Sequence, residues 1–307
     1  MTCTNHPDAA VNYYGLVENL VKKQGWISIS LIQRTFKLSY GYTLSLVDAL
    51  KHKGVVTPAD ADGKYALLLP TMPKRTDAMP QNNTSAITKS ELPALARKTL
   101  EPLLDQPGGI LYSSHLTLQP GKIYLMGLNP GGASENKPEY MLRANIDQML
   151  SNTQNAYLNQ CWGNYDTCGT APLQRRVKWL LEVLGENVQD VFATNLIFTQ
   201  SRNDNSLTQQ LARQCWPVHE AMLEIVQPSL IVTFGNGNSG LSPYSFLQAS
   251  FGGQPEDHPA SHGNWRLSRF HTTLNGRKTT VIGLPHLSRY QPMGKPDVEG
   301  WLKSCLA

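Results

Sequence analysis

Apolar side chains in the first 60 residues recur every three or four positions, which is the spacing of one helix face. The pattern predicts three helices: residues 11–24, 28–36 and 39–53. Gly25 and Gly54 follow the first and the third of them, as glycine commonly does where a helix ends. Two short β-prone runs come next, at 55–57 and 65–69. Three helices followed by a small hairpin predict a winged helix.

From residue 94 onward the pattern changes, and short continuous apolar runs alternate with amphipathic stretches. Four of the apolar runs are predicted to be strands: 122–126, 191–196, 230–234 and 278–282. Amphipathic helices are predicted between them, at 173–184 and 206–227. Strands that alternate with helices are typical of a parallel sheet with helices on both faces. The expected fold class is therefore α/β, a three-layer α/β/α domain with a four-stranded parallel central sheet, plus the small N-terminal winged helix.

A polar segment separates these two patterns. Residues 71–93 are rich in Pro, Asn, Thr and Ser and show no apolar period. Such a composition is typical of a linker rather than of a packed element. We therefore divide the chain into a winged-helix domain at 1–70, a flexible linker at 71–93 and an α/β domain at 94–307.

The charge of the chain changes this picture only in part. The net charge is +4 over 307 residues, so the chain is not a histone-like polycation. Bulk positive charge is the usual sign of a phosphate-binding protein, so this small value argues against nucleic acid at first sight. The charge is spread as +2 over residues 1–70, +1 over 71–93 and +1 over the remainder.

The cysteines and the apolar runs bear on the compartment. No apolar run reaches the roughly 18–20 residues that span a bilayer, and the N-terminus lacks the pattern of a secretory signal. The five cysteines are odd in number and scattered, which is typical of a reducing compartment rather than of a disulfide framework. Cys161 and Cys168 lie seven residues apart, without a second pair at metal-ligand spacing. We expect a cytoplasmic protein with no metal and no membrane partner.

The stretch from Val17 to Val56 resembles the gamma domain of bacterial DNA translocases of the FtsK type. The positions that match are Ile29, Ser30, Leu31, Ile32, Gln33, Arg34, Phe36, Tyr40, Leu46, Val47, Asp48, Leu50, Gly54 and Val55. The resemblance implies a winged helix whose third helix can enter a major groove, and it places the protein in the bacterial cytoplasm or nucleoid. The expected DNA contacts are Arg34, Lys37, Tyr40, Tyr42 and Lys51. The alternative is a winged helix used for protein contacts.

The chain departs from that family where bases would be read. The Arg-Ala pair expected after the Gly-Tyr pair is replaced around Thr43 and Leu44. The sequence preference of the family is therefore not carried over to this chain.

The loops after the four predicted strands are rich in Gly, Asn, Pro and His, and parallel strands bring such loops to one edge of the sheet. These loops resemble the motifs of the uracil-DNA glycosylase superfamily. The segments that carry the resemblance, in family order, are GLNPGG at 127–132, ATNLIFTQSRN at 193–203, the stretch from Cys215 through QPSLIVTFGNG, and GLPHLSRYQP at 283–292. The first motif has the Asn form of the mismatch-specific thymine/uracil branch. The resemblance implies an enzyme that flips a nucleotide out of double-stranded DNA.

The resemblance also implies roles for individual residues. Asn129 would orient a water molecule through its carbonyl oxygen, although an amide is no strong base, so the enzyme would be slow; the alternative is a turn residue. His286 would stabilise the leaving base or hold a phosphate, although it is displaced by about two places from the usual histidine. The residues expected to line the substrate pocket are Gly127, Leu128, Pro130, Gly131, Gly132, Asn195 and Ser288.

Two further features concern substrate and DNA contact. A tyrosine excludes C5 substituents in the uracil-specific branch, whereas Gly131 has no side chain, so the pocket is expected to admit a C5 substituent. The alternative is that Gly131 only satisfies the backbone and that Tyr140, Tyr157 or another aromatic closes the pocket. Leu287 and Arg289 are expected to form an intercalating loop; the alternative is a core leucine and a surface arginine.

These inferences combine into one functional hypothesis. The chain would be a monofunctional DNA glycosylase acting on a flipped pyrimidine, either a modified cytosine of phage DNA in antiviral defence or a mismatched uracil or thymine. The alternatives are a repair glycosylase for uracil and thymine mismatches, and a non-catalytic DNA-binding regulator on a glycosylase fold. The branch that carries an iron–sulfur cluster needs a cysteine pair upstream of the first motif, and only Cys3 lies there. No cofactor is expected.

Overall fold

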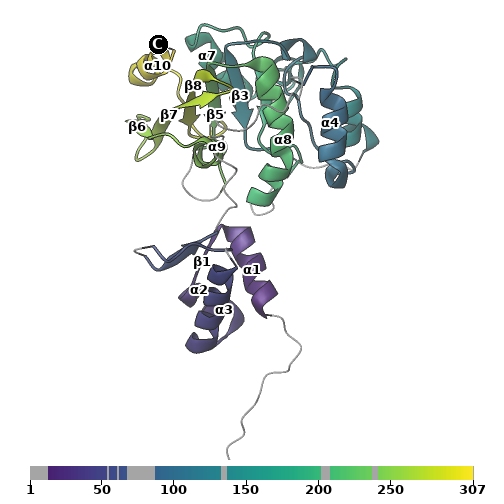
Figure 1. The fold of residues 1–307 in the computed structure, drawn as a ribbon. Helices are drawn as coiled ribbons and strands as arrows, with labels where there is room; N and C mark the ends of the chain where they lie inside the picture. Colours follow the sequence, from purple (N-terminus) through teal and green to yellow (C-terminus); the bar gives the residue numbers. More distant parts are fainter. Residues whose placement is uncertain are drawn as a thin grey trace, which may run out of the picture. The chain divides into compact units, whose positions relative to one another are not determined.

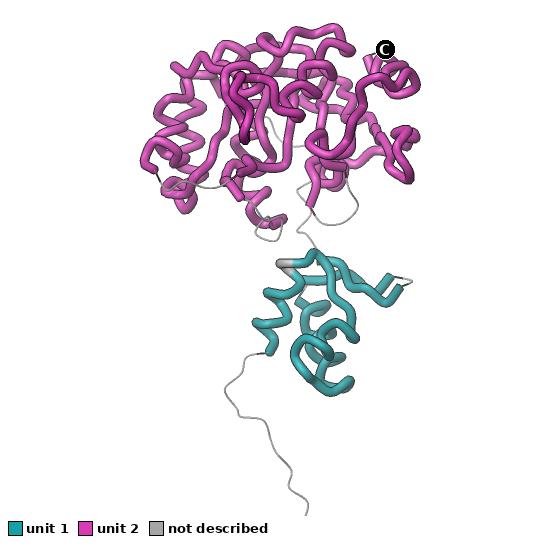
Figure 2. Tube along the Cα trace, turned by 180° about the vertical axis from the view of Figure 1, so that it is seen from behind, with its two compact units in different colours: residues 1–76 teal, residues 77–307 magenta. Residues whose placement is uncertain are grey.

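The computed structural model describes residues 13–53, 55–60, 62–67, 87–132, 137–201, 208–236 and 241–306. The chain divides into two compact units, Met1–Thr76 and Asp77–Ala307 (Figure 2). The predicted linker lies outside the described residues as far as residue 86. Its last two residues begin helix α4 (Leu92–Thr99), where Thr88 and Glu91 form a hydrogen-bonded turn ahead of the helix.

The first unit contains the three predicted helices, α1 (Tyr13–Gln24), α2 (Ile29–Phe36) and α3 (Tyr40–His52) (Figure 1). The side-chain oxygens of Ser28 and Ser39 accept hydrogen bonds from the backbone at the starts of α2 and α3, so each helix has a standard N-cap. The helices enclose a small apolar core that consists of Val17, Val21, Ile27, Ile32, Leu46, Val47, Leu50 and Val56.

The hairpin of this unit differs from the prediction. Strand β2 (Lys64–Ala66) pairs with β1 (Trp26–Ser28), which lies between α1 and α2. The predicted partner run contributes a single bridge, Val56 to Leu67. A three-residue strand between two helices has too few positions for period-two alternation to be recognised.

The second unit is built on a six-stranded sheet with the order β4-β3-β5-β8-β7-β6. Its four parallel strands are those predicted: β3 (Ile123–Gly127), β4 (Phe192–Asn195), β5 (Leu230–Phe234) and β8 (Arg277–Leu284).

The predicted number of four strands is wrong, because β6 (Glu256–Pro259) and β7 (Arg266–Leu274) add an antiparallel edge. β7 mixes buried and exposed positions, with three apolar residues among nine, and β6 is largely exposed. Neither strand therefore forms the continuous apolar run by which the other four were recognised.

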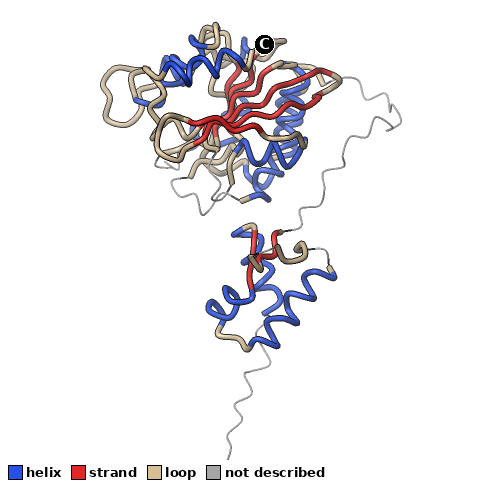
Figure 3. Tube along the Cα trace, turned by 90° about the vertical axis from the view of Figure 1, so that its left-hand side faces the viewer, coloured by secondary structure: helices blue, strands red, loops and turns tan. Residues whose placement is uncertain are grey.

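Helices cover both faces of this sheet (Figure 3). α7 (Pro172–Val183) and α10 (Pro296–Ser304) pack on the face of Ile123 and Leu125. On the other face, Tyr124 hydrogen-bonds to His219 of α8 (Gln209–Val226), α4 packs beside α8, and α9 (Pro243–Phe251) packs on β5 and β8. Short helices α5 (Leu142–Asp147) and α6 (Ala156–Asn159) lie between β3 and α7 in the chain.

The connections of this sheet reverse their direction at one place. The chain passes from β3 outward to β4, and from β5 to β8 on the opposite side. Ligands of open parallel sheets bind beyond the carboxyl ends of the strands where the direction of the connections reverses. That point lies between the carboxyl ends of β3 and β5. A segment ahead of β3 also runs beside β4, through bridges from Gly108 to Thr199 and from Leu111 to Thr194.

Candidate functional site

The first two motifs are hydrogen-bonded to each other at the carboxyl edge of the sheet. Gly127, the last residue of β3, is paired with Asn195, the last residue of β4. The pairing continues past the strands, because Leu196 and Ile197 donate to the carbonyls of Gly127 and Leu128 at 2.8 and 2.9 Å. A Cβ atom on Gly127 would lie 2.2 Å from the Asn195 Oδ1 atom. Glycine at this position therefore makes room for the Asn195 side chain.

Asn195 has a buried amide group that the protein does not satisfy. Its side chain is 4% exposed, and Nδ2 has no hydrogen-bond partner of normal geometry among the described residues. Burial raises the pKa of the nearby Tyr112 hydroxyl, and the Asn195 side chain lowers it by a smaller amount. An unpaired buried donor costs about 1–3 kcal/mol. A buried amide donor left unpaired at this edge is suited to a ligand with an acceptor atom.

Asn129 lies in the loop after β3 and is half-buried. Its Nδ2 donates to the carbonyl oxygens of Pro130, at 2.8 Å, and Ser201, at 3.1 Å. Because both partners are acceptors, the amide nitrogen faces the protein. The carbonyl Oδ1 is then the group that can accept a hydrogen bond from a water molecule.

The two glycines after Pro130 have different roles. Gly131 is exposed, and no atom of the described residues lies within 4 Å of the position that a Cβ would take. Its carbonyl accepts a hydrogen bond from Gln200 Nε2 at 2.8 Å. Gly132 has a φ of +92°, which favours glycine. The open space at Gly131 therefore does not result from a conformation that only glycine adopts.

Tyr140 and Tyr157, the aromatics considered for closing the pocket, are placed differently. Tyr157 is buried in the core that α7 and α10 cover. Tyr140 is exposed in a short helix, Pro138–Tyr140, where Lys137 lies over its ring. Tyr157 is thus a core residue.

His286 and Ser288 form a small hydrogen-bonded unit after β8. The Nδ1 atom of His286 lies 3.2 Å from the Ser288 backbone nitrogen and 2.7 Å from its Oγ. A backbone N–H can only donate, so Nδ1 accepts and the proton of the neutral ring is on Nε2. The ring packs edge-on against Phe234 of β5. His286 therefore lies at the same edge of the sheet as Asn129 and Asn195, with its ring proton on Nε2.

Leu287 does not lie where an intercalating side chain would. It is 0% exposed and belongs to the core between the sheet, α7 and α10, whereas Ser288 and Arg289 are exposed. In this structure Leu287 is a core leucine, as in the alternative stated above. The apolar neighbours of α7 and α10 account for its burial, and these contacts are distant in sequence.

Two residues that the sequence analysis missed position these loops. Arg176 of α7 donates from Nη1 to the carbonyls of Leu287, at 2.6 Å, and Ser288, at 2.9 Å. His219 lies between the Tyr124 hydroxyl, at 2.9 Å, and the Leu196 carbonyl, at 3.0 Å, and burial lowers its pKa to about 4. His219 shares the apolar helix spacing of its neighbours on α8, which is a signal in the sequence, whereas nothing in the sequence distinguishes Arg176 from Arg175.

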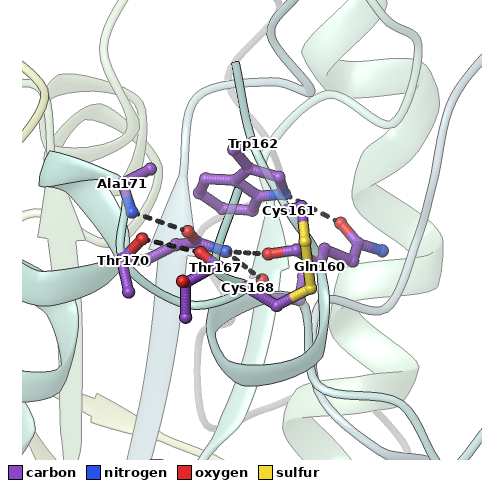
Figure 4. The surroundings of a disulfide bond; sticks show 9 residues. Gln160, Cys161, Trp162, Thr167, Cys168, Thr170 and Ala171 are labelled. Carbon is purple, nitrogen blue, oxygen red and sulfur yellow. Dashed lines mark hydrogen bonds between the residues drawn. A yellow bond between two sulfur atoms is a disulfide. The ribbon is translucent and has the colours of Figure 1, made fainter. Parts of the chain in front are cut away.

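The cysteine prediction needs a correction. Cys161 and Cys168 form a disulfide at the start of α7 (Figure 4), while Cys215 and Cys305 are free and buried. Cys161 and Cys168 are seven residues apart, so their disulfide closes a small loop. This pair was not predicted from the sequence because the five cysteines are scattered along the chain. The argument from cysteine usage to a reducing compartment therefore does not hold.

A hollow of about 560 Å³ lies at the opposite edge of the sheet, away from these motifs. Its lining comes from the amino ends of β5 and β8 and from the C-terminal residues, and includes Lys122, Ser229, His271, Lys278, Thr280 and Cys305. It does not involve the predicted site residues.

The predicted DNA contacts of the first unit lie on α2 and α3 and, for Lys37, at the C-cap of α2. Arg34, Lys37, Tyr40, Tyr42 and Lys51 are all exposed. Lys51 is paired with Asp48 at 3.2 Å, and the Tyr42 ring contacts Tyr13. Thr43, where the family has a basic residue, is buried and bonded to the Ser39 carbonyl. The position that departs from the family is therefore closed to a DNA base.

Comparison with known families identifies the first unit. Residues 11–69 match the family described as the Ftsk gamma domain, a winged-helix domain of the DNA-binding type. That part of the predicted resemblance is confirmed. No curated protein matches the chain. Within the described residues, no helix combines the length and the apolar character needed to cross a membrane.

Proposed function

We propose that the second unit is a monofunctional DNA glycosylase and that the winged helix holds double-stranded DNA for it. The observation that supports this most is the buried amide of Asn195, which lies against Gly127 and whose Nδ2 makes no hydrogen bond of normal geometry with the described residues. An amide that both donates and accepts is suited to the edge of a flipped base.

Cleavage of an N-glycosidic bond develops positive charge on the sugar and negative charge on the leaving base. Asn129 Oδ1 would accept a hydrogen bond from the attacking water and orient it, since Nδ2 is already used by the loop. The Nε2–H of His286 and the amide of Asn195 would donate to the leaving base as its charge develops. No motif residue is a lysine nucleophile, so the reaction would stop at the abasic site.

The substrate would be a pyrimidine that carries a C5 substituent. Support comes from Gly131, which is exposed and has open space where a side chain would be. This space favours a modified cytosine of phage DNA, and thus a role in antiviral defence, over repair of mismatched uracil or thymine. The modest charge of the second unit agrees with a division of labour, in which the first unit supplies DNA affinity through a tether.

The test is a strand-cleavage assay on labelled duplexes that contain uracil, a thymine mismatch, hydroxymethylcytosine or glucosylated hydroxymethylcytosine. Alkali would reveal an abasic product with the C5-substituted bases for the wild-type chain. Failure to produce an abasic site with every duplex would refute the enzyme. An Asn129→Ala variant should lose product formation and keep DNA binding. If its effect in cells instead equals that of the wild type, the chain is a non-catalytic DNA-binding regulator.

A further inference from the structure

The loop closed by the Cys161–Cys168 disulfide lies beside the candidate site, and the proposed function gives it no role. The centroid of the Trp162 ring lies 6.4 Å from that of Tyr112, whose backbone nitrogen donates to the Ala193 carbonyl of β4 at 2.8 Å. On the other side of the loop, α7 begins at Pro172, and its Arg176 binds the carbonyls of Leu287 and Ser288. One end of the loop therefore lies near the second motif (193–203), and the helix that follows its other end binds the last motif (283–292).

The base of the loop is held at several points besides the disulfide (Figure 4). Gln174 donates from Nε2 to the carbonyls of Ala156 and Gln160, at 2.8 and 2.7 Å. Trp162 donates to the Gln160 side chain at 2.9 Å, and its ring lies 5.6 Å from that of Tyr157. These contacts fix the two ends of the loop while its middle, residues 163–168, stays exposed.

Tyr165 lies in the exposed part of the loop and is 45% exposed. A large aromatic side chain in a loop with fixed ends loses little conformational freedom on binding, and stacking on a base is sequence-tolerant. A protein that extrudes a base needs a side chain to occupy the space that the base leaves. Leu287 is buried and does not offer one. Arg175, exposed in the first turn of α7, adds positive charge at the same end of the helix.

We infer that the Cys161–Cys168 loop is a DNA-contacting element of the second unit and that Tyr165 stacks in the gap left by the flipped nucleotide. This rests on the proposed function for the location of the gap. The disulfide acts as the clamp that keeps Tyr165 at this edge of the sheet.

The experiment compares two duplexes that differ in one position, one intact and one with a tetrahydrofuran abasic analogue. Fluorescence anisotropy with the full chain gives the affinity for each. Both duplexes offer the same intact flanking DNA to the winged helix, which we expect to bind them alike, so the ratio of affinities reports on the second unit. Tyr165→Ala should lower the preference for the tetrahydrofuran duplex about tenfold, the order expected of one base–aromatic stack. Tyr165→Phe should keep it, and the double change Cys161→Ser with Cys168→Ser should lower it.

Tyr140→Ala is the matched control, because Tyr140 is an exposed tyrosine of similar exposure at 47%. It should leave the preference unchanged. The inference fails if the wild-type chain binds both duplexes equally, if Tyr165→Ala leaves the ratio as it is, or if Tyr140→Ala lowers the ratio instead. None of these measurements requires glycosidic cleavage. If the chain forms no abasic product but Tyr165→Ala still lowers the preference for the tetrahydrofuran duplex, the glycosylase proposal fails. The inference that the loop contacts DNA then stands.

Discussion

The two units of this chain depend on contacts of different range. In the first unit, α2 and α3 begin at the serine caps Ser28 and Ser39, three residues from the backbone groups that they bind. In the second, the site depends on Gly127 meeting Asn195 and on Arg176 meeting Leu287, pairs that lie 68 and 111 residues apart. Local contacts leave a readable pattern in a sequence, and distant ones do not. The first unit matches a family model over residues 11–69, whereas the loops of the second unit meet only through pairs that are far apart in the sequence.

The largest effect expected is that of Gly127→Ala. A Cβ there would lie 2.2 Å from Asn195 Oδ1 and 3.0 Å from Phe234 Cζ, and such overpacking costs about 3 kcal/mol. Guanidinium unfolding followed by hydrogen exchange should show the loss in the strands of the second unit alone. Gly131→Ala is the control and should leave stability unchanged, since its Cβ meets open space. Equal losses for both variants would contradict the placement of Asn195 against Gly127.

The stabilities of the two units are also expected to differ in their response to acid. Burial lowers the pKa of His219 from 6.5 to about 4, so the folded state disfavours its charged form. This stability is fully present above pH 6.5 and is lost as the pH falls from 6.5 towards 4, by about 3 kcal/mol at most. The described part of the first unit contains His52, which is exposed. Lowering the pH from 7 to 5 should therefore destabilise the second unit more than the first. Hydrogen exchange at the two pH values measures the stability of each unit.

The control for this prediction is His219→Phe. It should cost about 1–3 kcal/mol at pH 7, because the Tyr124 hydroxyl and the Leu196 carbonyl lose a buried partner. It should also flatten the pH dependence between 6.5 and 4. An unchanged slope would assign the acid sensitivity to other groups.

Arg176→Gln tests the hold on the last motif. Removing its bonds to the Leu287 and Ser288 carbonyls should cost about 1–2 kcal/mol, because the bonds are charge-assisted but half-exposed. The loop should exchange its amide protons faster, and Arg175→Gln, a change at an exposed neighbour, should have no such effect. Identical behaviour of the two variants would show that the loop is held by other contacts.

The smallest effect expected is in the first unit. Ser39→Ala removes the cap of α3, where Oγ lies 3.4 Å from the Tyr42 nitrogen, and a bond this long contributes about 0.5 kcal/mol. Ser45→Ala, an exposed change inside α3, should be neutral. Any change in hydrogen exchange of the second unit with Ser39→Ala would mean that the units are energetically coupled.

The residues also show where prediction from sequence ends. The four parallel strands were predicted correctly because they are buried on both faces and therefore continuous apolar runs, such as Leu230–Phe234. The β6–β7 edge was missed because β6 is largely exposed and β7 has few apolar residues, and the partner of β2 was missed because three residues are too few. At the site, the residue types of Asn129 and Asn195 could be read from the sequence. The burial of Leu287 depends on packing against α7, which is distant in sequence. The pairing of Cys161 with Cys168 is local, but their spacing does not distinguish a disulfide from two free cysteines.

The two outer strands of the sheet have a consequence for self-association. An unpaired strand edge is a template on which another chain can add a strand. On one side, β4 is accompanied by the segment that bridges Thr194 and Thr199. On the other, β6 has four residues and carries Glu256, Asp257 and Pro259, which oppose such addition through charge and a missing donor. Both lateral edges of the sheet are thus protected against the addition of a strand from another chain, while the carboxyl ends of the parallel strands stay available for the proposed ligand.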